Sequence, residues 1–79
     1  MALAELQRAI EARVREQIER HLRVDPRANI ARIVELQMQQ EQERLEHLID
    51  EADEAQSEAL FALMAWLPQF EQQLKRRAR

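Results

Sequence analysis

A run of 41 residues without proline or glycine, from Arg27 to Leu67, most constrains how this 79-residue chain folds. The whole chain has no glycine, and its two prolines flank the run. Because glycine is the usual residue where a backbone needs positive φ, such a chain has few ways to build hairpin turns or bulges. Glycine-rich phosphate loops are excluded for the same reason. The sequence therefore predicts an all-α protein with few connections.

The length of the chain allows one domain, residues 1–79. A domain of this size buries only about 60% of the surface that its unfolded chain exposes, so its stability is marginal without a staple or a partner. Cysteine is absent, which excludes disulfides and thiol chemistry. The longest apolar run, 59–67, is far shorter than the ~20 residues of a membrane span, and charges at 5, 8 and 11 are incompatible with a signal peptide. We expect a cytoplasmic location.

Apolar residues recur every three or four positions over about residues 2–22, which predicts a first helix with one apolar face. Asp25 and Pro26 follow, and a residue before proline is pushed out of the helical region. Asp at the N-cap followed by Pro at the first helical position is also a favourable helix start. A second helix is therefore expected to begin near residue 26 and to pack antiparallel to the first.

The second apolar stripe shows no obvious stop from Ile30 to Leu67, and it continues in phase through Pro68. This pattern predicts a helix over about 26–67 and a kinked helical extension over about 68–77, because Pro68 removes one backbone hydrogen bond. An alternative break lies in residues 50–57, where Asp53 and Gln56 fit a capping box. That break would give a closed three-helix bundle in place of a long hairpin.

The long hairpin leaves apolar surface uncovered, because a helix of about 21 residues spans ~32 Å and one over 26–67 spans ~63 Å. The residues expected to form the hairpin core are Leu6, Ile10, Val14, Ile18, Ile30, Val34, Leu45 and Leu48. Exposed apolar patches mark interfaces, and two-fold dimers are the commonest oligomers. We therefore expect a homodimer or partner interface made by the uncovered residues, Leu60, Leu63, Trp66, Leu67, Phe70 and Leu74.

Glu41 interrupts the second apolar stripe between Met38 and Leu45. Two explanations are open. The carboxylate pairs with an arginine across the bundle, such as Arg13, and helps to fix the register of the helices. Alternatively, the bundle is open at this point and Glu41 reaches water along its methylene stem, which is the favoured interpretation.

Catalytic and metal-binding groups are scarce. His47 has carboxylates three and four residues away, a spacing that metal-binding bundles use, but these residues fall on the outer face of the helix. Ser57 is the only serine, and the chain has no Cys, Thr or Tyr. We expect no enzyme activity, no metal and no cofactor.

The net charge of −3 is unevenly distributed. Residues 41–58 hold eight acids and one arginine, whereas residues 59–79 hold four basic residues and one acid. The basic tail, with Lys75, Arg76, Arg77 and Arg79, suggests contact with nucleic acid, although the acidic band would repel phosphate. We expect a homodimeric helical bundle that acts as an adaptor, chaperone or regulator of a partner protein. The alternative is a nucleic-acid-associated regulator that uses the tail and the Arg-rich first helix.

Overall fold

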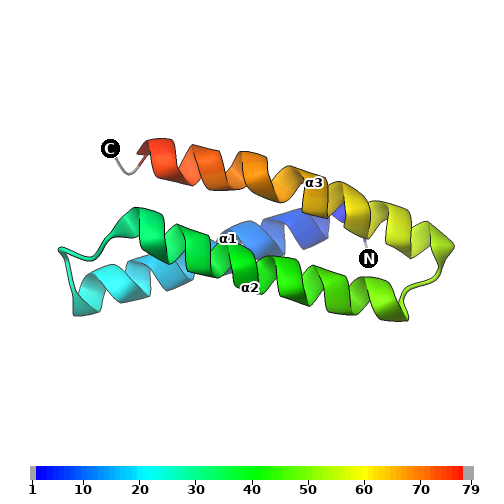
Figure 1. Cartoon of the computed structure of the whole chain (residues 1–79), viewed down its shortest axis with the longest axis horizontal. Coiled ribbons are helices and arrows are strands. Elements are labelled where there is room, and N and C mark those ends of the chain that lie inside the picture. The colour runs from blue at the N-terminus through cyan, green and yellow to red at the C-terminus, as the bar shows by residue number, and fades with distance from the viewer. Residues whose placement is uncertain (1, 78–79) are drawn as a thin grey trace.

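The computed structural model describes residues 2–77, and these form three helices and no strand. The helices are α1 (Leu3–Val24), α2 (Ile30–Glu51) and α3 (Glu54–Arg77). Figure 1 shows α2 and α3 running antiparallel side by side, while α1 crosses behind them and packs against both. Because the helices have similar lengths of 22, 22 and 24 residues, they form a rod of 43 × 20 × 18 Å.

The uninterrupted helix predicted over 26–67 is wrong, because the chain reverses direction at Ala52 and Asp53. Ala52 takes an extended conformation with φ −86° and ψ 152°. The Asp53 side chain then caps α3 by accepting a hydrogen bond from the backbone N–H of Gln56, with an N–O distance of 2.8 Å. This cap is one half of the alternative capping box. The reversal lays the apolar face of α3 on α2, and the resulting fold is the alternative three-helix arrangement.

The predicted start of α2 near residue 26 is also wrong, since the helix begins at Ile30. The Asp25 side chain accepts a hydrogen bond from the backbone N–H of Arg27 (3.0 Å), and the Asp25 carbonyl accepts one from Ala28 (3.0 Å). Asp25 thus closes a turn around Pro26 and does not cap a helix, a competition that is usual for short polar side chains. Asn29 caps α2 through the N–H of Arg32.

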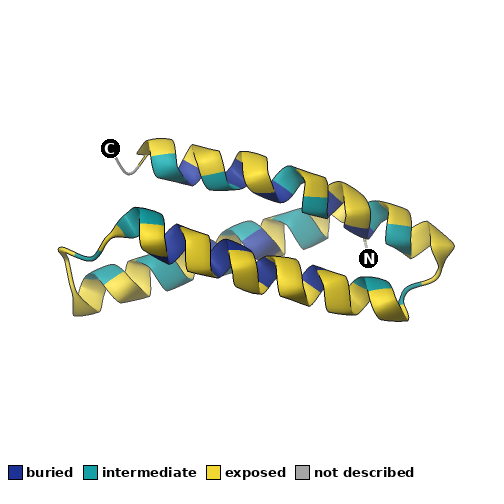
Figure 2. Ribbon diagram, viewed as in Figure 1, coloured by how far each residue is buried: buried dark blue, intermediate teal, exposed yellow. Residues whose placement is uncertain are grey.

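The core of the rod is a continuous stripe that draws on all three helices (Figure 2). Of the predicted hairpin core, Ile10, Val14, Val34 and Leu45 are buried. Leu6, Ile18 and Ile30 are partly buried against that core. Leu48 was expected inside but is 40% exposed.

The residues predicted to lack cover within the chain are buried inside it, so this expectation is wrong. Leu60, Leu63, Leu67, Phe70 and Leu74 belong to the core, and Trp66 is partly buried against it. α3 continues through Pro68, as the in-phase stripe predicts. The helix reversal is the physical reason, because it brings this stripe back against α2. These side chains therefore give no reason to expect a homodimer, while the oligomeric state itself stays a prediction.

The rod exposes more surface than a rounder protein would. Its accessible area is 5891 Å², against about 5000 Å² for a typical monomer of 9.4 kDa. The excess follows from three helices lying side by side, which leaves each with a broad outer face. None of the helices in residues 2–77 has the length and apolarity needed to cross a membrane.

Candidate functional site

The chain reverses between α2 and α3 at one end of the rod (Figure 1, right). Side chains near this reversal line a groove. Its volume is about 300 Å³, close to the lower limit for pockets that hold ligands. α1 contributes one side chain, the end of α2 two, the turn after it one, and the start of α3 three. The lining residues are Leu6, Leu48, Glu51, Ala52, Gln56, Ala59 and Leu60.

Small side chains explain why this end of the bundle is hollow. Ala52 and Ala59 stand where larger residues would fill the space between the helices, and both line the groove. Leu6 and Leu60 supply apolar walls, and Leu48 leaves 40% of its surface to solvent at the opening. The groove therefore offers an apolar surface with few polar groups of its own.

At this end of the rod the charges on α2 and α3 are almost all negative, while α1 has Glu5 and Arg8 near Leu6. Between Arg44 and Lys75 the chain contains no lysine or arginine. The last turns of α2 and the first turns of α3 carry six carboxylates, on Glu46, Asp50, Glu51, Asp53, Glu54 and Glu58. Within residues 2–77 no three acidic or histidine side chains converge as a metal site requires. Glu51 is the carboxylate that lines the groove, and the others give this end of α2 and α3 a negative potential.

A buried ion pair joins α1 to α2 in the middle of the rod. Arg13 donates from Nε to Glu41 Oε1 at 2.6 Å and from Nη2 to Glu41 Oε2 at 2.7 Å. Glu41 is only 2% exposed, whereas the Arg13 side chain is 36% exposed. The hydrogen bond to Glu41 raises the pKa of Arg13 above its usual value, against the opposing effect of burial. The favoured interpretation, that Glu41 reaches water, is therefore wrong, because Arg13 covers the carboxylate in bidentate geometry.

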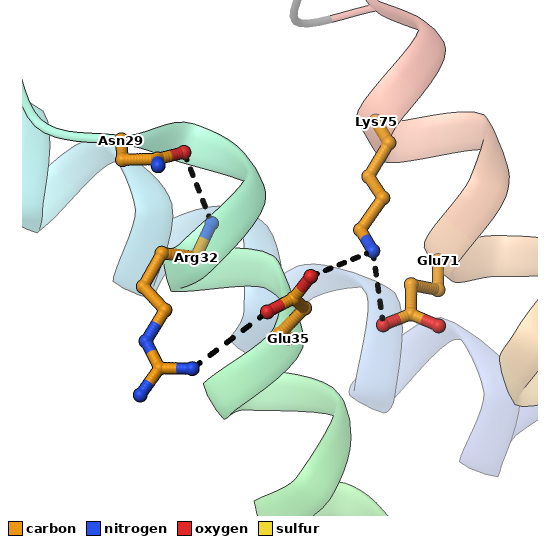
Figure 3. A network of polar contacts seen from close by, with 5 residues as sticks. All are labelled: Asn29, Arg32, Glu35, Glu71 and Lys75. Atoms are coloured by element: carbon orange, nitrogen blue, oxygen red, sulfur yellow. Dashed lines mark hydrogen bonds and ion pairs between the residues drawn. The ribbon is translucent and has the colours of Figure 1, made fainter.

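A second polar network joins the C-terminal end of α3 to the N-terminal end of α2 (Figure 3). Lys75 Nζ lies 3.1 Å from Glu35 Oε1 and 3.7 Å from Glu71 Oε1. Arg32 approaches the other oxygen of Glu35 at 3.8 Å. The hydrogen bond to Glu35 raises the pKa of Lys75 above its usual value.

This network changes the prediction for the basic tail. Lys75 is engaged within the bundle, while Arg76 and Arg77 are exposed on the last turn of α3. The fourth predicted nucleic-acid contact, Arg79, lies outside the described residues. His47 is exposed, with Nε2 3.8 Å from Glu51 Oε1, which agrees with its predicted place on the outer face of α2.

One aromatic contact lies within α3, and a second joins α3 to α1. The rings of Trp66 and Phe70 stack with centroids 4.9 Å apart, and the guanidinium of Arg15 lies 5.9 Å from the Phe70 ring centre. These contacts place Trp66 and Phe70 in the fold of a single chain. Phe70 is buried in the core and Trp66 is partly buried against it, so neither is the uncovered side chain that the sequence predicted.

The groove itself was not predicted, because its walls come together only when the chain reverses at residues 52–53. The local signals that pointed toward it were the Asp53 cap and the small residues around it. No family model matches the chain, and neither a curated protein nor a solved structure matches it significantly.

Proposed function

We propose that the chain is a non-enzymatic protein–protein interaction module that binds a basic amphipathic helix of a partner protein in the groove beside Leu48. The observation that carries this proposal is a mainly apolar groove of about 300 Å³ at the end of the rod where α2 and α3 carry mostly negative charge. As an adaptor, chaperone or regulator, the module would hold one helical segment of its partner.

The shape of the groove supports a helical ligand. α1, α2 and α3 each contribute a wall, so a fourth helix laid between them would extend the same side-to-side packing. Helix-in-groove recognition uses apolar residues spaced three and four apart as anchors. The partly exposed Leu48 and the wall residue Leu60 are the surfaces that such anchors would cover.

The charge pattern supports a basic ligand. A helix with lysine and arginine flanking its apolar face would meet the carboxylate of Glu51, which lines the groove. Such complementarity raises the association rate and excludes acidic competitors. An acidic helix with the same apolar anchors should bind far more weakly.

A peptide titration tests the proposal. The probe is a fluorescently labelled helical peptide with leucines at helical spacing and lysines on the flanks, and its control has the same composition in scrambled order. Leu48→Asp should weaken binding about tenfold or more, because a charge would enter the apolar opening. Leu36→Asp is the matched control, since Leu36 lies on the same helix, is 44% exposed and is outside the groove.

Two results would contradict the proposal. Equal losses in the Leu48 and Leu36 variants would show that the groove is not the binding site. Equal binding of the scrambled peptide would show that charge alone attracts the probe. Circular dichroism of each variant would confirm that the helices are retained.

The nucleic-acid alternative now depends on fewer residues, because Lys75 is paired with Glu35 and Glu71. Arg76 and Arg77 are the exposed cations of the described tail. Salt-dependent binding of a DNA or RNA duplex that is lost on Arg76→Ala and Arg77→Ala would favour this alternative.

A further inference from the structure

The outer face of α3 carries the longest uncharged run of exposed residues in the described part of the chain. Between Ala59 and Gln73 every exposed residue of α3 lacks a charge, and Glu71 is half-buried in its pair with Lys75. The exposed residues are Phe61, Ala62, Ala65, Pro68, Gln69, Gln72 and Gln73. Depletion of charge together with an exposed aromatic side chain is typical of the centre of a protein interface.

These residues form a stripe and not a scattered set. Phe61, Ala65, Pro68 and Gln72 follow one another at spacings of four, three and four, which is the repeat of a helix face that packs along another helix. Phe61 is 57% exposed, so its ring is the largest apolar group available on the stripe. Ala65 near the centre is small enough to let a second helix approach closely.

Charges of opposite sign close the two ends of this stripe. Glu58 lies three residues before Phe61, and Glu54 lies four residues before Glu58, so both continue the stripe toward the start of α3. Arg76 continues it at the other end, one turn beyond Gln72. All three are exposed. Because one end of the stripe is negative and the other is positive, two copies of it in antiparallel orientation bring opposite charges together.

We infer that the outer face of α3 binds a second copy of this chain, with the two α3 helices antiparallel about a two-fold axis near Ala65 and Pro68. An alignment that sets Phe61 opposite Gln72 of the second copy also sets Glu58 beside Arg76 of that copy. A parallel arrangement would instead place like charges together at both ends, which is unfavourable. Two-fold symmetry uses each surface twice, so both ends of the interface form the same contact.

This inference deepens the homodimer of the sequence prediction, but it assigns the dimer to the face of α3 opposite the predicted residues. It does not depend on the groove, whose lining residues lie at the end of the rod. Only one large apolar side chain per copy lies on the stripe, so the dimer is expected to be reversible, with a dissociation constant in the micromolar range.

Sedimentation equilibrium over a wide range of protein concentration tests the inference. The wild-type chain should pass from a single-copy mass of 9.4 kDa to twice that mass as the concentration rises. Ala65→Glu should weaken the dimer by about tenfold or more, because it buries a charge at the centre of the interface. Ala12→Glu is the matched control, since Ala12 is exposed on α1, and it should leave the dimer unchanged.

A charge exchange tests the antiparallel orientation. Glu58→Arg alone, or Arg76→Glu alone, should weaken the dimer because each places like charges together in the interface. The double variant Glu58→Arg/Arg76→Glu should restore it, since the pair is re-formed with its signs reversed. Failure of the double variant to restore the dimer would overturn the antiparallel arrangement.

The two proposals are separable by experiment. Ala65→Glu should still bind the basic helical peptide in the groove, and Leu48→Asp should still form the dimer. A single-copy mass at every concentration, or a dimer that Ala65→Glu leaves intact, would overturn the inference about α3. Neither result would affect the groove, and circular dichroism would establish that each variant is folded.

Discussion

The ion pair between Arg13 and Glu41 makes the two single substitutions at this site unequal in cost. Arg13→Met leaves a carboxylate that is 2% exposed without its partner. Removing one partner of a buried pair typically costs about 3–5 kcal/mol of unfolding free energy. Glu41→Met leaves an arginine that is already 36% exposed and that reaches water along its stem, so its cost should be about 1 kcal/mol or less.

Urea unfolding followed by circular dichroism measures this difference. A chain of 79 residues is expected to have a total stability of about 4–12 kcal/mol. With a urea dependence of about 1 kcal/mol per molar, the Arg13→Met midpoint should fall by ~3 M or more and the Glu41→Met midpoint by ~1 M or less. The Arg13→Met variant is therefore expected to lie near the limit of folding.

The double variant shows whether stability is lost because one charge is left unpaired or because the pair itself is removed. Arg13→Met/Glu41→Met replaces the pair with two apolar side chains of similar length, so its stability should be close to that of the wild type. Arg20→Met is a control, because Arg20 pairs with Glu16 on the exposed surface of α1, and its cost should be below about 0.5 kcal/mol. Equal losses for the two single variants at the buried pair, or a larger loss for Glu41→Met, would refute the reasoning.

Three further predictions test the rest of the fold. Asp53→Ala removes the cap of α3 and should cost about 0.5–2 kcal/mol in the same urea assay, with no change expected if the chain does not reverse there. Phe70→Ala should cost about 3–5 kcal/mol and shift the fluorescence of the stacked Trp66 to longer wavelength, whereas an unshifted spectrum would contradict the stacking. The hydrogen bond to Glu35 raises the pKa of Lys75 above 10.5, so the charged lysine stabilises the fold at neutral pH. The melting temperature of the wild type should therefore exceed that of Lys75→Met at neutral pH, and the difference should disappear well above pH 10.5. A difference that persists there would contradict the ion pair.

The helical class of the fold was predictable from the sequence, and so were the first helix and the passage of the last helix through Pro68. Each depends on apolar spacing within one segment, which sequence carries directly. The reversal at Ala52 and Asp53 depends instead on packing between helices. No residue near it strongly disfavours a helix, and the Asp53 cap is worth only about 1 kcal/mol. Cover of Leu63 and its neighbours by α2 is the larger effect, and it is visible only in three dimensions.

The polar features were predictable to the same extent: spacing within one segment was visible in the sequence, and contacts between helices were not. The spacing of apolar residues showed that Glu41 stands in an apolar stripe. Whether water or Arg13 binds its carboxylate depends on how closely α1 approaches α2 beside Glu41, which the sequence does not show. The groove could not be predicted from the sequence for a similar reason. Leu6 and Leu60 share no pattern along the chain, and only the packing of the start of α1 against the other two helices brings them to one cavity.

The reversal also determines which surfaces are left for partners. In an unbroken second helix, the acidic segment would lie in the middle of a long rod, and the apolar stripe from Leu60 to Leu74 would be its exposed surface. The reversal buries that stripe and gathers the carboxylates at one end, while Arg76 and Arg77 come to the other end. A rod with opposite charges at its ends pairs most favourably with itself in the antiparallel sense, and its negative end attracts cationic helices. The turn at Asp53 is thus the common origin of the groove and of the charge separation, whereas the outer face of α3 would be exposed with or without it.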